Sequence, residues 1–288
     1  MRAKCINVFL MDGEPSGRVK CTLANWTGVV YKIPRTELEK CKERKDLSQS
    51  GVYFLYGKSE DSDKDEVYIG QAGVRKSGEG ILCRLQEHRR STDKEYWTEA
   101  IVFTTSNNSF GPTEISWLEN RFRNLAVTAN RYSVKNSNEP NIGNVTEEKE
   151  SELEEFVDYA KVVMGVLGHK VFESLTLFDS NTELQGNLLF YCKRKGIEAK
   201  GQRVSDGFVV LEGSTVQMKI TSSCPDSVKT AREKYKSAID ENGMLLQNIL
   251  FSSPSAASSF VTYASSNGNI EWQTADGRTL KGVESNEA

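Results

Sequence analysis

Two short apolar runs separated by a strongly charged segment constrain the fold more than any other feature of the chain. Residues 51–56 are Gly-Val-Tyr-Phe-Leu-Tyr and residues 66–70 are Glu-Val-Tyr-Ile-Gly, whereas residues 58–65 are all Lys, Ser, Glu or Asp. Runs of β-branched and aromatic residues around a polar connection are typical of a hairpin. We therefore predict a pair of neighbouring strands joined by a charged loop.

The residues before this hairpin predict further strands and one short helix. The apolar run 5–11 and the β-branched residues that lead to Tyr31 indicate a hairpin or small sheet. Thr36, followed three residues later by Glu39, is typical of a helix start and predicts a helix over 36–46.

Helical and strand-like patterns alternate after the hairpin. Residues 81–90 have helical periodicity and residues 100–105 form a strand-like run. Pro112 opens a long helix that we expect to end near residue 130. One face of this helix carries an apolar stripe: Ile115, Leu118, Phe122, Leu125 and Ala129.

The last half of the chain indicates a second α+β domain. A helix over 147–168 begins acidic, becomes apolar and is predicted to connect the two parts. Beyond it we predict strands at 187–192, 207–211 and 216–220, a helix at 227–242, a Ser/Ala-rich segment at 252–259 and a hairpin at 275–277. The resulting domains are a β-rich extension (1–47), a central domain (48–145), a helical connector (146–180) and a C-terminal α+β domain (181–288).

The net charge argues against a protein that coats nucleic acid. The chain has 288 residues, enough for two domains, and a formal net charge of -3. Phosphate neutralisation by Lys and Arg supplies most non-specific affinity for nucleic acid. Any contact with nucleic acid must therefore use local patches, such as the net basic segment 1–45.

The cysteines and the hydropathy pattern indicate a cytosolic protein. The six cysteines include no CxxC pair, and the two histidines complete no zinc motif. No apolar run is long enough to span a bilayer, and the N-terminus has no cleavage signal. We expect reduced thiols, and neither secretion nor membrane insertion.

Gly51-Val52-Tyr53 and Tyr68-Ile69-Gly70, on successive strands, resemble the two-strand signature of the GIY-YIG nucleases. The order of polar residues downstream is similar to that of the family. The resemblance implies a small domain with a three-stranded antiparallel sheet flanked by helices. It further implies a metal-dependent DNA endonuclease that uses a single Mg²⁺, with Mn²⁺ as an alternative. The implied catalytic residues are Tyr53, Tyr68, Arg84, His88, Glu119 and Asn136.

Arg84 and His88 are four residues apart, which places both side chains on one helix face. The resemblance implies that Arg84 holds a phosphate oxygen, for which a forked and permanently charged guanidinium is well suited. The alternative is a surface arginine paired with Glu87.

Glu119 is a carboxylate at the edge of the apolar stripe, where it needs a partner. The resemblance implies that it binds the metal, because Mg²⁺ is commonly held by one carboxylate together with waters and substrate oxygens. The alternative is an exposed glutamate paired with Arg123, four residues along the helix.

Tyr53 is the implied general base. A phenol titrates near pH 10, so it must lose its proton with the help of the cation and Arg84 or pass it to His88. Tyr68 would orient the phosphate or the water. The alternative for both tyrosines is packing on a sheet face. Asn136 would shape the site surface, with Asn138 and Asn141 as nearby alternatives.

Residues 183–283 resemble a domain of unknown function that occurs in bacterial proteins, often behind such nucleases. The basic run 193–195 and a basic helix could contact phosphates, and Trp272 could stack on a base. The alternatives are a solvated helix face and a core tryptophan. The basic helix carries Lys229, Arg232, Lys234 and Lys236.

Two alternatives to a DNA endonuclease remain open from the sequence. One is a non-catalytic adaptor that binds nucleic acid with the nuclease fold, and the other is a nuclease that acts on RNA. Family contexts include repair, restriction and phage defence, and the sequence does not choose among them.

Overall fold

The protein forms two compact units in a computed structural model. The first unit is Met1–Ser174 and the second is Leu175–Ala288. The structure describes residues 3–58, 65–175, 188–194, 196–221 and 223–286. The charged loop predicted at 58–65 lies almost entirely outside these residues. Within the described ranges, no helix is long and apolar enough to cross a membrane.

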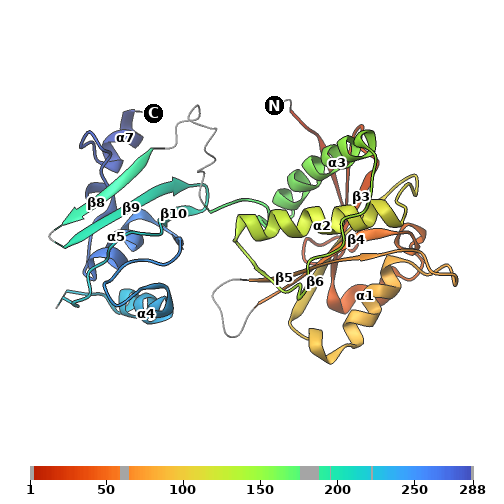
Figure 1. Ribbon diagram of the computed structural model, residues 1–288, viewed down its shortest axis with the longest axis horizontal. Helices are drawn as coiled ribbons and strands as arrows, with labels where there is room; N and C mark the ends of the chain where they lie inside the picture. The colour runs from red at the N-terminus through yellow and green to blue at the C-terminus, as the bar shows by residue number, and fades with distance from the viewer. Residues whose placement is uncertain (1–2, 59–64, 176–187, 195, 222, 287–288) are drawn as a thin grey trace. The chain divides into compact units, whose positions relative to one another are not determined.

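The first unit contains a seven-stranded sheet, wider than the three-stranded sheet that we predicted (Figure 1). Neighbouring strands are antiparallel, except that β7 runs parallel to β5. In spatial order the strands are β1 (Ile6–Leu10), β2 (Val19–Leu23), β3 (Gly28–Pro34), β6 (Trp97–Thr105), β4 (Gly51–Gly57), β5 (Glu66–Ala72) and β7 (Ser133–Val134).

The N-terminal strands are part of this sheet because β3 pairs with β6 along its whole length, from Gly28–Thr105 to Pro34–Glu99. This pairing satisfies backbone groups of β6 that would otherwise form an open edge. The predicted three strands, β4, β5 and β6, are the centre of the sheet, and the predicted extension enlarges it on one side.

The helices of the first unit follow the predicted pattern with one exception. The helix predicted over 36–46 is instead two 3₁₀ turns, because Leu38 and Cys41 are buried at the three-residue spacing of a 3₁₀ helix. The helical elements are η1 (Arg35–Cys41), η2 (Lys45–Ser48), α1 (Ile81–Arg90), η3 (Thr92–Lys94), α2 (Pro112–Ala129) and α3 (Glu147–Val166).

The sheet separates two apolar cores, because successive residues of a strand point to opposite faces. Tyr53 packs with residues of α1 on one face, and Phe54 packs with residues of α2 and α3 on the other. Figure 1 shows α1 on one side of the sheet and α2 and α3 on the other. The helix that we predicted as a connector, α3, therefore belongs to the core of the first unit. Its buried face is Leu153, Phe156, Val157, Ala160, Val163 and Met164.

The second unit is a four-stranded antiparallel sheet with short helices. The strand order is β11 (Ile249–Phe251), β10 (Gly207–Val210), β9 (Ile197–Val204) and β8 (Leu189–Arg194). The helices are α4 (Asp226–Lys234), η4 (Lys236–Ala238), α5 (Pro254–Thr262), α6 (Gly268–Glu271) and α7 (Leu280–Asn286). Phe208, Phe260 and Trp272 lie in the core of this unit.

Several predicted elements of the second unit differ from the structure. Residues 216–220 are not a strand, because Met218 and Ile220 are both 52% exposed and so share no buried face with Val216. The helix predicted at 227–242 ends at Lys234. The Ser/Ala-rich segment is helix α5. The predicted final turn forms, with Gly277 at φ +85° in the left-handed region.

Candidate functional site

The two signature triplets lie side by side on β4 and β5, and the glycine of each triplet is required for steric reasons. Tyr53 is paired with Gly70 in the register of the two strands. A Cβ on Gly70 would lie 2.4 Å from the Tyr53 hydroxyl oxygen, and a Cβ on Gly51 would lie 2.3 Å from the carbonyl oxygen of Phe103. Only glycine leaves room for the Tyr53 ring and for the close approach of β6.

Tyr53, Tyr68 and His88 of α1 form a polar cluster in which Tyr53 and His88 are buried and Tyr68 is half-buried. The hydroxyl oxygen of Tyr53 lies 2.5 Å from Nε2 of His88. The ring centroid of His88 is 5.4 Å from that of Tyr53 and 5.5 Å from that of Tyr68. The His88 ring therefore lies close to both strand tyrosines.

Tyr53 and His88 are both uncharged near neutral pH. Burial raises the pKa of Tyr53 far above its usual range. Burial, together with the charges of Lys94 and Arg84, lowers the pKa of His88 to about 3. The phenol therefore keeps its proton and the imidazole is neutral. In the His88 tautomer that carries its proton on Nδ1, Tyr53 donates its hydroxyl proton to Nε2.

Arg84 lies next to Tyr53 and is also paired with Glu87. Its Nη1 is 2.9 Å from a Glu87 carboxylate oxygen, so the alternative weighed for Arg84 is realised in the structure. Arg75 shares the same carboxylate at 2.6 Å. Burial disfavours the Arg84 cation, but Glu87 and the Tyr53 hydroxyl outweigh this and raise the pKa of Arg84. A guanidinium that contacts both groups retains donors for a further anion.

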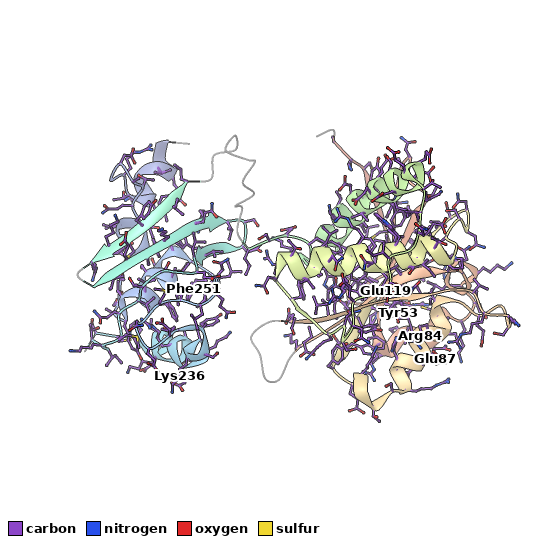
Figure 2. The ribbon with its side chains drawn as sticks, viewed as in Figure 1. Tyr53, Arg84, Glu87, Glu119, Lys236 and Phe251 are labelled. Atoms are coloured by element: carbon purple, nitrogen blue, oxygen red, sulfur yellow. The ribbon has the colours of Figure 1, made fainter. Side chains whose placement is uncertain are left out.

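Glu119 reaches the same cluster from α2, the helix on the other face of the sheet. Burial raises the pKa of Glu119, and hydrogen bonds from the side chain and backbone of Gln71, with the charge of Arg84, offset part of that effect. The Glu119 charge in turn raises the pKa of Tyr68. Figure 2 shows Glu119, Tyr53 and Arg84 following one another from α2 across the sheet to α1.

The alternative weighed for Glu119 is not realised. Arg123 donates to the side chain of Asn124 at 3.1 Å, and within the part of the chain that the structure describes it forms no ion pair with Glu119. The carboxylate of Glu119 is thus held by Gln71 and lies near enough to Arg84 to feel its charge.

Asn136 is placed beside the cluster rather than in it. Its amide nitrogen donates to the backbone carbonyl of Ile69 at 2.7 Å, and its amide oxygen accepts from the backbone N–H of Ile69 at 3.1 Å. Both ends of the amide are therefore occupied by the strand that carries Tyr68. Asn136 follows β7 in the chain and extends the pairing of β7 with β5, so it holds β5 in position. Asn138, by contrast, is exposed.

Two residues near the cluster were missed by the sequence reasoning. One is Gln71, the partner of Glu119. The other is Lys94, whose Nζ lies 3.2 Å from the ring centroid of Tyr68. Burial, with the charge of Arg84, lowers the pKa of Lys94 to about 8. Gln71 follows the second triplet directly and could have been chosen by its position, but no motif points to Lys94.

The site is compatible with a cation held by a single carboxylate. Among the described residues, no group of three or more His, Cys, Asp or Glu side chains could hold a metal. Mg²⁺ usually keeps several waters and binds one or two carboxylates with substrate oxygens, so it does not require such a group. Glu119, half-buried and facing the tyrosines, is the side chain here that fits this role.

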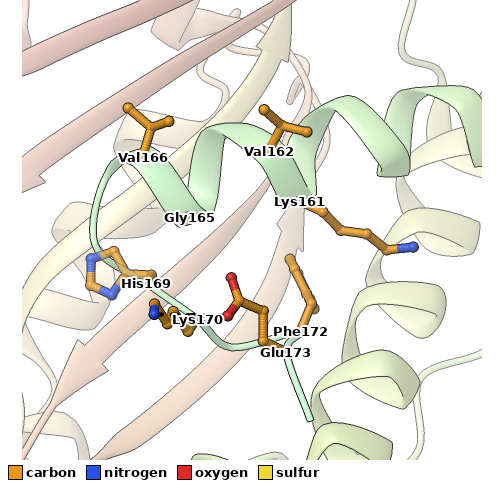
Figure 3. A pocket seen from close by; sticks show the side chains of 8 residues that line it. All are labelled: Lys161, Val162, Gly165, Val166, His169, Lys170, Phe172 and Glu173. Atoms are coloured by element: carbon orange, nitrogen blue, oxygen red, sulfur yellow. Dashed lines mark ion pairs between the residues drawn. The ribbon is translucent and has the colours of Figure 1, made fainter. Parts of the chain in front are cut away.

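A separate hollow of the first unit involves none of the six predicted site residues (Figure 3). It is lined by the end of α3 and by residues 169–173. His169 follows the helix end, stacks on Tyr56 at 3.8 Å between ring centroids, and lies 2.7 Å from a Glu99 oxygen. His169 therefore ties the end of α3 to the sheet.

The residues of the second unit that we considered for DNA contact are largely engaged within that unit. Trp272 is fully buried and donates its indole N–H to the carbonyl of Pro254 at 3.0 Å, so it is not available to stack on a base. Arg232 is also buried and donates to the carbonyls of Phe260 and Gln217. The exposed lysines Lys229 and Lys236 pair with acidic neighbours on their own helical turns.

Comparison with family models matches residues 190–284 to a domain of unknown function, DUF4357. This confirms the C-terminal resemblance, with bounds of 190–284 in place of 183–283. The match covers about a third of the chain and carries no activity with it. No model of the GIY-YIG family matches the chain. Neither the curated proteins nor the solved structures give a match.

Proposed function

We propose that the first unit is a metal-dependent endonuclease of the GIY-YIG type that hydrolyses phosphodiester bonds of DNA. The observation that carries this proposal is the meeting of five polar side chains from four elements in one cluster. They are Tyr53 from β4, Tyr68 from β5, Arg84 and His88 from α1, and Glu119 from α2. A protein that catalyses no reaction has no need to bring these groups together.

Arg84 is the proposed ligand of the scissile phosphate. Negative charge grows on the phosphate oxygens during hydrolysis, and a fixed guanidinium stabilises this charge without rearrangement. The ion pair with Glu87 helps to hold Arg84 in place. A phosphate that binds at the site would meet the guanidinium next to the Tyr53 hydroxyl.

Tyr53 and His88 are the proposed proton relay. Tyr53 accepts a proton from the attacking water while it gives its own hydroxyl proton to Nε2 of His88. This relay is supported by the 2.5 Å contact between the two atoms. Burial lowers the pKa of His88, and the charges of Lys94 and Arg84 lower it further; a bound phosphodiester anion would oppose these two charges. Substrate binding therefore makes His88 a better proton acceptor.

Glu119 is the proposed ligand of Mg²⁺, with Mn²⁺ as the alternative ion. When bound, the cation would neutralise charge on the phosphate and on the leaving oxygen. Gln71 keeps the Glu119 carboxylate in place. Tyr68 borders the same space and would orient the phosphate, and Asn136 positions the strand of Tyr68.

Incubation of the full chain with supercoiled plasmid and with RNA, each with Mg²⁺ or with EDTA, tests this proposal. We expect nicked or linear plasmid with Mg²⁺ and none with EDTA. Cleavage of RNA but not of DNA would mean that the substrate is RNA. Binding without cleavage of either nucleic acid would mean that the protein is an adaptor and not a nuclease.

The variant Glu119→Gln tests the metal ligand itself. We expect the cleavage rate to fall at least ~100-fold, in line with the loss of one group that stabilises transition-state charge. The melting temperature and the binding of DNA should change little. The matched control is Glu152→Gln, an exposed carboxylate on α3 that pairs with Lys149. Normal cleavage by Glu119→Gln would refute the metal assignment.

A further inference from the structure

Lys94 is a half-buried cation beside the candidate site. Its Nζ lies 3.2 Å from the ring centroid of Tyr68. Among the residues that the structure describes, no carboxylate lies within ion-pair distance of this ammonium group. The aromatic ring compensates only part of the hydration that the ammonium group has lost.

The neighbours of Lys94 make an anion more favourable at this position. Arg84 is near enough to lower the pKa of Lys94, and both cations act on the pKa of His88. Two positive side chains thus border the same pair of rings. The carboxylate of Glu87 pairs with Arg84 and Arg75, so within the described part of the chain it does not pair with Lys94.

The segment that carries Lys94 is held firmly in place. Nη1 of Arg35 donates to the backbone carbonyls of Lys94 and Glu95 at 3.1 and 2.8 Å. Nη2 of the same guanidinium donates to the carbonyl of Arg89 at 3.0 Å, at the end of α1. Arg35 also packs over the ring of Trp97. The position of Lys94 over Tyr68 is therefore built by the fold and is not one of many positions of a free surface lysine.

We propose that Lys94 is a substrate-binding residue that contacts a backbone phosphate of the nucleic acid on the Tyr68 side of the site. This inference rests on the proposed function and adds a second cationic contact to that of Arg84. Two cations beside the tyrosine pair suit a nucleic-acid strand that runs across the site. One phosphate of this strand would contact Arg84, and another backbone phosphate would contact Lys94. The substrate class is thus a polynucleotide.

The salt dependence of binding measures such a contact directly. In the non-cleaving Glu119→Gln background, Kd for a labelled duplex is measured by fluorescence anisotropy over a range of KCl concentrations. Loss of one phosphate contact should reduce the slope of log affinity against log salt by about 0.9. We expect this reduction for Lys94→Met and a near-normal slope for Lys94→Arg. The control Lys161→Met removes a half-buried lysine that pairs with Asp158 and should leave the slope unchanged.

A second measurement uses the chain without substitution at Lys94. Amine-reactive labelling of Lys94 should slow several-fold when a duplex oligonucleotide is bound, whereas labelling of Lys161 should not. This arm keeps the inference testable if Lys94→Met fails to fold. An unchanged salt slope in a folded Lys94→Met protein, or unchanged labelling of Lys94 at saturating duplex, would overturn the inference.

Failure of the proposed function gives a different result. Wild-type protein that binds duplex through Lys94 but cuts neither DNA nor RNA in Mg²⁺ would refute the nuclease and keep the phosphate contact. Wild-type protein that cuts DNA while Lys94→Met retains the full salt slope would keep the nuclease and refute the contact. A fall in kcat with an unchanged slope would mean that Lys94 only orders the Tyr68 ring.

Discussion

The hydroxyl of Tyr53 lies 2.5 Å from Nε2 of His88, and both side chains are almost fully buried. Removal of either partner leaves the other as a buried polar group without its hydrogen bond. Such a group costs about 1–3 kcal/mol of folding free energy. The proposed relay and the stability of the first unit therefore depend on the same bond.

Replacement of His88 by Phe should separate these two contributions. The ring still fills the space against Tyr53 and Tyr68, but it accepts no proton. We expect the cleavage rate to fall by about 10²–10⁴-fold, the usual contribution of a positioned base. The free energy of unfolding should fall by roughly 1–3 kcal/mol because the Tyr53 hydroxyl loses its acceptor. Single-turnover cleavage and urea unfolding measure the two effects. Full activity in a folded variant would remove His88 from the relay.

The pH dependence of stability should also depend on His88. Its pKa is lowered to about 3 in the folded chain, from an ordinary value of 6.5. Between these two values the unfolded chain binds more protons than the folded one, so the stability gained from neutral His88 is present above pH 6.5 and is lost as the pH falls. Below the pKa that His88 has in the unfolded chain, the free energy of unfolding falls by up to about 1.4 kcal/mol per pH unit.

The comparison of wild type with His88→Phe isolates this effect from the other titrating groups. Urea unfolding at pH 7.5, 6.0 and 5.0 should show a steeper decline for the wild type than for the variant. Equal pH profiles for the two proteins would mean that His88 is not held neutral by burial.

Local periodicity made part of this structure predictable from sequence. The bounds of α1 match the predicted helix 81–90, and Pro112 marks the start of α2. The pairing of β4 with β5 follows from two runs with a polar connection. These features depend on residues close together in the chain, where strand and helix periods differ clearly.

Long-range contacts could not be read in the same way. The pairing of Asn136 with Ile69 joins residues 67 positions apart, and nothing in the sequence marks it. Lys94 lies over Tyr68 in a segment whose backbone is bonded by Arg35, 59 positions earlier in the chain. The strand β9 was missed because its buried positions include the small residues Ala199 and Gly201, which give a weak apolar alternation.

Substitution of Gly70 by Ala should disturb the site through sterics alone. The added Cβ would lie 2.4 Å from the Tyr53 hydroxyl oxygen, so the Tyr53 ring must shift from the position in which it contacts His88. Overpacking of this kind typically costs about 1–3 kcal/mol. We expect lower stability and strongly reduced cleavage. The matched control is Gly73→Ala, where the nearest atom is a methyl group of Ile115 at 3.8 Å. Equal activity of the two variants would mean that the position of Tyr53 is not critical.

The two hydrogen bonds between Asn136 and Ile69 lead to a last prediction, on the role of this asparagine. Replacement of Asn136 by Ala leaves the N–H and carbonyl of Ile69 without these partners, and each unsatisfied buried group costs about 1–3 kcal/mol. We expect lower stability and faster amide hydrogen exchange at Ile69, whereas Asn138→Ala, at an exposed position, should change neither.

Cleavage should fall less in Asn136→Ala than in Glu119→Gln, because Asn136 acts on the site only through the strand that carries Tyr68. Unchanged exchange at Ile69 together with loss of cleavage would reverse this assignment. It would mean that the Asn136 amide leaves the strand and contacts the substrate itself.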